Sequence, residues 1–189
     1  LTGSGSIAQA SQVIDDGTLL LSGGTYGRAL QRLSGTGMVQ LDAAELAILA
    51  ADHTFSGIIS GTGSLAIDGG IETLTGHNSY TGATTIASGA TLVLSGSGSI
   101  AASSGVSDNG SLDISATRAG ATISSLAGSG SVSLGAQTLS IGVAPGRASG
   151  VISVVSEPSR NKHSPHLPTH HRHTGTTTIH RRAPIHLTG

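Results

Sequence analysis

Five histidines close to the C-terminal end of the chain are the residues best suited to binding a metal. They are His163, His166, His170, His171 and His173. Imidazole nitrogens bind zinc, copper and nickel, and short histidine spacings can bring several of them to one ion. The chain beyond Ser153 holds four of the five prolines, which favours an extended chain with nothing to order the ligands. We therefore predict no metal and no other cofactor, and keep these histidines as the alternative.

Carboxylates are the second group that could do chemistry. The ten are Asp15, Asp16, Asp42, Glu45, Asp52, Asp68, Glu72, Asp108, Asp113 and Glu157. A polysaccharide lyase or glycosidase gathers several carboxylates on one face. Here Asp16 precedes Gly17, and its repeat partner Asn109 precedes Gly110, as is typical of turns. We expect solvated turn residues and predict that the protein is not an enzyme; an enzyme acting on polysaccharide is the alternative.

Glycine-rich motifs and two isolated histidines offer no further chemistry. Three segments fit a loose dinucleotide-binding fingerprint, namely Gly3–Ala8, Gly61–Ala66 and Gly96–Ala101. That fingerprint requires a helix after it and an acidic residue further on, and no amphipathic helix follows any of the three. We interpret the glycines as turns. His53 and His77 have no nucleophile nearby in the sequence, and we expect them at the surface.

The composition indicates which elements position these residues. The chain has 189 residues with 29 Gly, no Cys, no Trp, one Phe and two Tyr, and its apolar residues are mostly Ala, Ile, Leu and Val. Small and β-branched side chains suit a narrow interior between short strands. The aliphatic residues are too numerous and regular for a disordered chain. A net charge of −1 with 10% charged residues excludes a basic surface for nucleic acid.

An internal repeat of 93 residues organises the chain. Residues 1–60 align with residues 94–153 without a gap, and 27 of these 60 pairs are identical. An aliphatic residue followed by a small residue and Gly-x-Gly recurs within each copy, for example at Leu1, Leu33, Leu94 and Leu126. Repeats of this kind are typical of solenoids. We expect four coils of roughly 23 residues in each copy, and eight coils in a rod on the order of 40 Å long.

Short segments between the glycine clusters read as strands with two aliphatic residues on one face. They are Val39–Leu41, Leu46–Ile48, Leu65–Ile67, Leu92–Leu94, Leu112–Ile114, Val132–Leu134 and Leu139–Ile141. The alternation directs Leu112 and Ile114 inward and Asp113 to water. The helix-like stretch Ala43–Ala51 aligns with a strand-like one, Ala136–Ala144, so we predict strand for both. The fold class is therefore all-β, a parallel β-solenoid of short stacked strands.

One part of the repeat resembles a known family. Leu74-Thr-Gly-His-Asn-Ser-Tyr80-Thr-Gly-Ala-Thr-Thr-Ile86 is followed by Gly89-Ala-Thr-Leu-Val-Leu-Ser-Gly96. This is similar to the autotransporter-associated β-strand repeat, also called the passenger-associated transport repeat. The matching residues are Tyr80, Gly82, Thr84, Ile86, Gly89, Leu92 and Leu94. The resemblance is specific over about residues 51–96 and covers residues 1–153 as architecture.

The resemblance implies a right-handed parallel β-helix and a place outside the cell. Such repeats belong to passenger domains displayed on the surface of Gram-negative bacteria, ahead of a C-terminal β-barrel translocator that this chain does not include. We therefore expect a structural or adhesive passenger segment whose repeats support export and folding. The implied partners are its own β-barrel translocator and surface ligands on host or neighbouring cells, with no nucleic acid.

The chain divides into a repeat array over residues 1–153 and an irregular His-, Pro- and Arg-rich segment over 154–189. At the same offset of 93, residues 61–73 and 154–166 share no identity, yet 10 of 23 pairs match between 74–96 and 167–189. A designed linker would not preserve the register in this way. We interpret part of 154–186 as a frame-shifted reading of a third copy, which the nucleotide sequence in its other frames would test.

Overall fold

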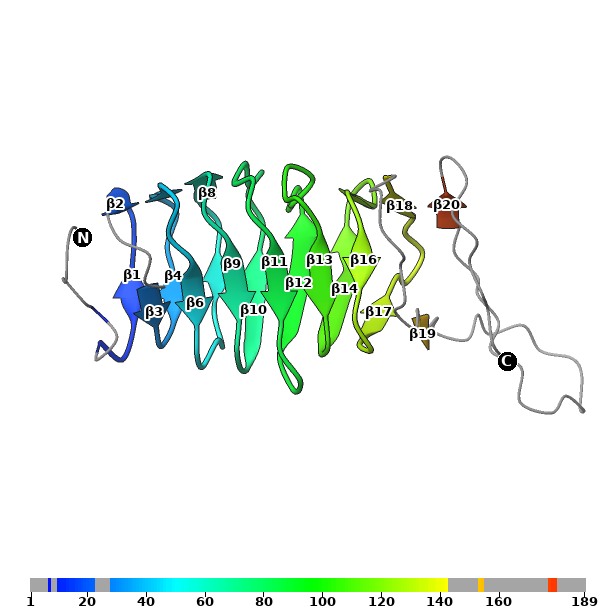
Figure 1. Cartoon of the computed structure of the whole chain (residues 1–189), viewed down its shortest axis with the longest axis horizontal. Helices are drawn as coiled ribbons and strands as arrows, with labels where there is room; N and C mark the ends of the chain where they lie inside the picture. The colour runs from blue at the N-terminus through cyan, green and yellow to red at the C-terminus, as the bar shows by residue number, and fades with distance from the viewer. Residues whose placement is uncertain (1–6, 8–9, 23–27, 143–152, 155–176, 180–189) are drawn as a thin grey trace, which may run out of the picture.

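The computed structural model describes residue 7 and the ranges 10–22, 28–142, 153–154 and 177–179. Over these ranges the regular structure is all β, and the strands stack in parallel as a β-solenoid of about six turns. Figure 1 shows the coils following one another along the long axis of the molecule. The prediction of an all-β parallel solenoid is confirmed. The histidine-rich segment and most of the predicted irregular region lie outside the described residues.

The strands are short. They are β1 (Val13–Ile14), β2 (Thr18–Leu21), β3 (Arg28–Leu30), β4 (Leu33–Ser34), β5 (Met38–Leu41), β6 (Leu46–Ile48), β7 (Thr54–Phe55), β8 (Ile58–Gly61), β9 (Leu65–Ile67), β10 (Ile71–Leu74), β11 (Thr84–Ile86), β12 (Thr91–Gly96), β13 (Val106–Asp108), β14 (Ser111–Thr117), β15 (Ala121–Ile123), β16 (Leu126–Ala127), β17 (Ser131–Ser133), β18 (Leu139–Ile141), β19 (Ser153–Val154) and β20 (Thr177–Ile179). Strands of this length are unstable alone, so they depend on the coils above and below.

The coils place the strands on three faces. Sheet I contains β7, β10, β12, β14, β17 and β19, and the pair β1–β4 leads into it through a bridge between Gly35 and Phe55. Sheet II contains β3, β6, β9, β11, β13 and β16. Sheet III consists of β2–β5–β8 near the N-terminal end and β15–β18–β20 near the other end. Strands β2, β8 and β18 lie along the same upper edge in Figure 1.

The strand register gives a coil of about 20 residues, at the short end of what solenoid repeats use. Successive partners in sheet II begin at Arg28, Leu46, Leu65, Thr84, Val106 and Leu126. These sequence numbers rise by 18, 19, 19, 22 and 20 from one strand to the next. The expectation of roughly 23 residues for each coil is therefore wrong, because it was taken from the spacing of glycine motifs that occur at different corners.

The shorter coil changes how the two repeat copies relate. Strand pairings of the first copy recur in the second: Val13 pairs with Leu33 as Val106 pairs with Leu126. Yet β1 leads into sheet I, whereas its counterpart β13 lies in sheet II. The repeat copy thus spans a non-integral number of coils, and the second copy is turned by one face. Asp15 and Asp108 therefore lie on different faces.

Aliphatic ladders fill the interior. One ladder runs through Leu46 and Leu65, and its neighbour through Ile48, Ile67 and Ile86, all of them fully buried. Each such side chain contributes about 1.5–3 kcal/mol relative to exposure. The predicted alternation is confirmed at β14, where Leu112 and Ile114 are buried and Asp113 is half-buried. Ala47 and Ala66, between ladder residues, are also buried.

Glycine is required where one coil crosses closely over another. Gly61 has a φ of 105°, and a Cβ at this position would overlap the Leu41 carbonyl oxygen of the preceding coil. Non-glycine residues rarely adopt this backbone region. The Gly-x-Gly motif that begins at Gly61 is therefore a corner element in this structure, as the sequence predicts.

Candidate functional site

The residues that resemble the passenger repeat form a buried hydroxyl network at one corner. The Tyr80 hydroxyl lies 2.7 Å from Thr84 Oγ1, and Thr84 Oγ1 donates to Ser103 Oγ at 3.0 Å in the next coil. Ser103 in turn donates to the carbonyl oxygens of Gly82 and Gly105, each at 3.0 Å. Tyr80, Thr84 and Ser103 are all buried. Burial raises the pKa of Tyr80, so its phenol stays neutral and available for this bond.

The remaining motif residues shape the coil around this network. Ile86, Leu92 and Leu94 are fully buried in the core. Gly89 has a φ of 81° in the turn before β12. A Cβ on Gly82 would overlap the Gly63 carbonyl oxygen of the coil beneath. In this structure the motif is a packing element that joins successive coils.

Asn78 forms a separate set of hydrogen bonds across three coils, although it is not among the motif residues predicted from the sequence. Its Oδ1 accepts the backbone N–H of Ile59 at 2.9 Å, and its Nδ2 donates to the carbonyl oxygens of Gly76 and Ser99, both at 3.1 Å. The side chain is 5% exposed. A buried amide with its hydrogen bonds satisfied is a strong determinant of register. In the sequence, the feature that indicates this role is the position of Asn78 two residues before Tyr80, on the same side of an extended segment.

Glu72 is a buried acid within an aliphatic ladder. It pairs in register with Leu92, which pairs with Leu112. Its side chain is fully buried, and neither carboxylate oxygen has a hydrogen-bond partner. Desolvation, followed by the nearby Asp52 charge, raises the pKa of Glu72 to about 9. Glu72 is therefore protonated at neutral pH. The expectation of a solvated carboxylate was wrong here, because Glu72 and Leu74 are two residues apart on β10 and both point into the core.

Asp52, on the coil beneath this acid, contacts a guanidinium and an imidazole. Arg32 Nε lies 2.8 Å and His53 Nε2 lies 3.3 Å from Asp52 Oδ1. Asp52 is half exposed. Thr54 pairs with Thr73, and the same parallel register places Asp52 beside Ile71, the residue before Glu72. Carboxylates of neighbouring coils thus approach each other at Asp52 and Glu72. Because Glu72 is inaccessible in this structure, the pair does not form an open catalytic site.

Two aspartates in equivalent repeat positions are also buried. Asp15 is 7% and Asp108 2% exposed, so solvated turns were the wrong expectation for them. Oδ1 of each accepts the backbone N–H of the glycine two residues on, Gly17 at 3.1 Å and Gly110 at 2.9 Å. In both, Oδ2 has no partner. Burial is the main cause that raises the pKa of Asp108.

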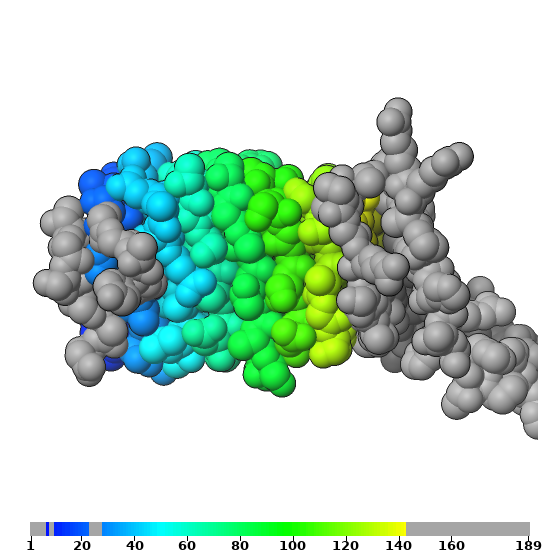
Figure 2. Space-filling model, viewed as in Figure 1, coloured from blue at the N-terminus to red at the C-terminus, as the bar shows by residue number. Residues whose placement is uncertain are grey.

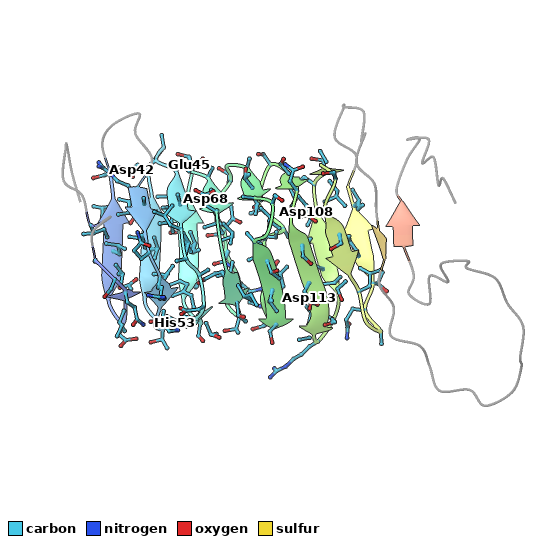
Figure 3. The ribbon with its side chains drawn as sticks, turned by 90° about the horizontal axis from the view of Figure 1, so that it is seen from below. Asp42, Glu45, His53, Asp68, Asp108 and Asp113 are labelled. Carbon is cyan, nitrogen blue, oxygen red and sulfur yellow. The ribbon has the colours of Figure 1, made fainter. Side chains whose placement is uncertain are left out.

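Other carboxylates are dispersed over the surface. Figure 3 places Asp42, Glu45 and Asp68 towards one long edge and His53 at the opposite edge. Asp113 Oδ1 accepts the Ser115 N–H at 2.8 Å, which is a local contact within β14. His77 is exposed, as expected, whereas His53 is half-buried. Among the residues with described positions, no three His, Cys, Asp or Glu side chains form a group able to hold a metal.

The five histidines His163, His166, His170, His171 and His173 lie outside the described residues. Within the described ranges, no helical segment has the length and apolar character that crossing a bilayer requires. Comparison of the chain with models of protein families, with curated proteins and with solved structures finds no match.

Proposed function

We propose that this chain is a structural or adhesive passenger segment of a Gram-negative autotransporter, displayed on the cell surface, whose repeats support export and folding. One observation carries the proposal: each strand of sheet II pairs with a strand only one coil away in the chain, a separation of about 20 residues. Each coil is thus completed by the coil that follows it. A stack of this kind can propagate its fold from one end.

Sequential folding is useful to a chain that emerges through a membrane in an extended state. A coil that has left the pore can pair with the coil already outside, and the buried ladder residues oppose its return. Each buried Leu or Ile contributes about 1.5–3 kcal/mol, so one coil with several such residues provides a directional bias. The corner network of Tyr80, Thr84 and Ser103 adds hydrogen bonds between successive coils.

The outer surface is compatible with a displayed rod. The compact stack in Figure 2 shows successive coils forming a continuous body. Outward positions of sheet I carry small polar residues such as Thr91, Ser111 and Ser131, which pair in register. Ser131 Oγ donates to Ser111 Oγ at 3.3 Å. Such a surface supports an extended contact with other cells or with the neighbouring matrix.

Surface display in a Gram-negative host tests the proposal. The chain is placed between a secretion signal and an autotransporter β-barrel, and external protease digestion measures the exported fraction. We expect efficient display of the native chain. Gly61→Ala, which introduces overlap with Leu41, is expected to stall display; Gly17→Ala, where a Cβ meets open space, is the control. Equal display of both variants, or retention of the native chain inside the cell, would refute the proposal.

The alternative is a β-helix enzyme acting on polysaccharide. The approach of Asp52 to Glu72 is the observation in its favour, because glycoside hydrolysis uses a pair of carboxyl groups that flank the scissile bond. This function requires that the coil open to admit substrate. Release of reducing ends from acidic and neutral polysaccharides, and its loss in Glu72→Gln, would favour the enzyme over the rod.

A further inference from the structure

The turn between β13 and β14 combines an exposed asparagine with a following glycine. Asn109 is exposed and precedes Gly110. An asparagine in this context can lose its side-chain amide when the next backbone nitrogen attacks Cγ, because glycine has no side chain to hinder the approach. The neighbours of Asn109 determine whether the fold assists or prevents this reaction.

Two donors from the next coil polarise the Asn109 side-chain carbonyl. The backbone N–H of Ser129 lies 3.2 Å and Ser129 Oγ 3.4 Å from Asn109 Oδ1. Donors at a carbonyl oxygen stabilise the negative charge that develops there when a nucleophile adds. Because Oδ1 is held by Ser129, the side chain keeps one orientation while its Nδ2 group remains the leaving group.

A carboxylate is placed to take the proton from the attacking nitrogen. Gly110 N donates to Asp108 Oδ1 at 2.9 Å, and Asp108 Oδ2 has no partner. Asp108 is 2% exposed, and burial makes its carboxylate a stronger base by raising its pKa. A base within hydrogen-bond reach of the proton it removes meets the geometric requirement for general-base assistance.

We propose that Asn109 is a site of self-modification, at which the Asp108–Gly110 turn and Ser129 promote deamidation of the folded chain. Gly110 N forms a bond to Asn109 Cγ, and its proton passes through Asp108 to the departing Nδ2. The Cγ–Nδ2 bond breaks, ammonia leaves and a five-membered succinimide remains. Water then opens the ring at Cγ to give aspartate, or at the main-chain carbonyl to give isoaspartate.

The first repeat copy shows that the fold accommodates the aspartate product. Asp16 occupies the position equivalent to Asn109, and its Oδ1 accepts the Thr36 N–H at 3.0 Å and the Thr36 hydroxyl at 3.2 Å. These are the contacts that Asn109 makes with Ser129. Deamidation of Asn109 to aspartate therefore gives the second copy the same residue as the first copy has at Asp16, and the hydrogen bonds to Ser129 can be retained. Isoaspartate would insert a methylene into the main chain between β13 and β14.

Peptide mapping by mass spectrometry tests the proposal on the folded chain. After incubation at neutral pH we expect the amide-to-acid mass change at Asn109, with aspartate the main product, and no change at the buried Asn78, the internal control. Asp108→Asn should slow conversion by about tenfold or more, while circular dichroism confirms the fold. Ser129→Ala, at an exposed side chain, should slow it to a smaller extent.

Three results would overturn the proposal. The first is conversion of Asn109 no faster than that of Asn78. The second is faster conversion in urea than in the folded chain, since the fold would then protect the amide. The third is an unchanged rate in both Asp108→Asn and Ser129→Ala; if Asp108→Asn does not fold, the Ser129→Ala rate alone decides. Asn109→Asp should unfold at the same urea concentration as the native chain.

Discussion

Replacement of Glu72 by glutamine should stabilise the solenoid at neutral pH. In the native state the Glu72 carboxyl is buried, unpartnered and protonated, with a pKa of about 9. Glutamine has the same shape and is neutral, so the folded states of the two chains should be nearly equal in energy. The difference arises in the unfolded state, where glutamate ionises at its ordinary pKa of 4.5 and glutamine does not.

The sign and the size follow from proton linkage. Between pH 4.5 and about 9 the folded chain holds a proton that the unfolded chain has lost, so the free energy of unfolding falls as pH rises. Each pH unit in this window changes it by about 1.4 kcal/mol. At pH 7 the native chain is therefore less stable than Glu72→Gln by about 3 kcal/mol. The two should converge below pH 4.5.

Urea unfolding followed by circular dichroism, repeated across this pH range, measures the difference. Glu45→Gln is the matched control, since Glu45 is exposed and its replacement should leave the pH dependence unchanged. A difference between native chain and Glu72→Gln that does not grow with pH would contradict the proton linkage. A variant less stable than the native chain at pH 7 would show that the carboxylate is ionised and partnered in the folded state.

Two further substitutions test the corner elements by urea unfolding at neutral pH. Tyr80→Phe removes the hydroxyl that bonds Thr84 and should lower the free energy of unfolding by about 1 kcal/mol; an unchanged midpoint would mean that the network adds no stability. Gly61→Ala should cost about 1–3 kcal/mol from the positive φ, and more from overlap with Leu41, whereas Gly17→Ala should change the midpoint little; equal effects would argue against the close crossing.

Strand positions were predictable because they depend on local alternation. The segments around Leu65, Leu92 and Leu112 are strands as predicted, with their aliphatic residues buried. The burial of Glu72 was not predicted, because a carboxylate is normally expected in solvent. That Glu72 points to the same side as Leu74 can be recognised only when the bounds of β10 are known. The coil length was mistaken for a related reason: glycine motifs mark corners, and a coil has more than one corner.

Residue order alone specifies the aliphatic ladders, the duplication and the glycine corners, because these depend on local geometry and on comparison of the chain with itself. The strand register, and with it a coil of about 20 residues, became visible only in the folded molecule. Register also turns the second copy by one face, so that Asp15 and Asp108 lie on different faces. Stacking between coils fixes these relations, since backbone hydrogen bonds between parallel strands join residues one coil apart.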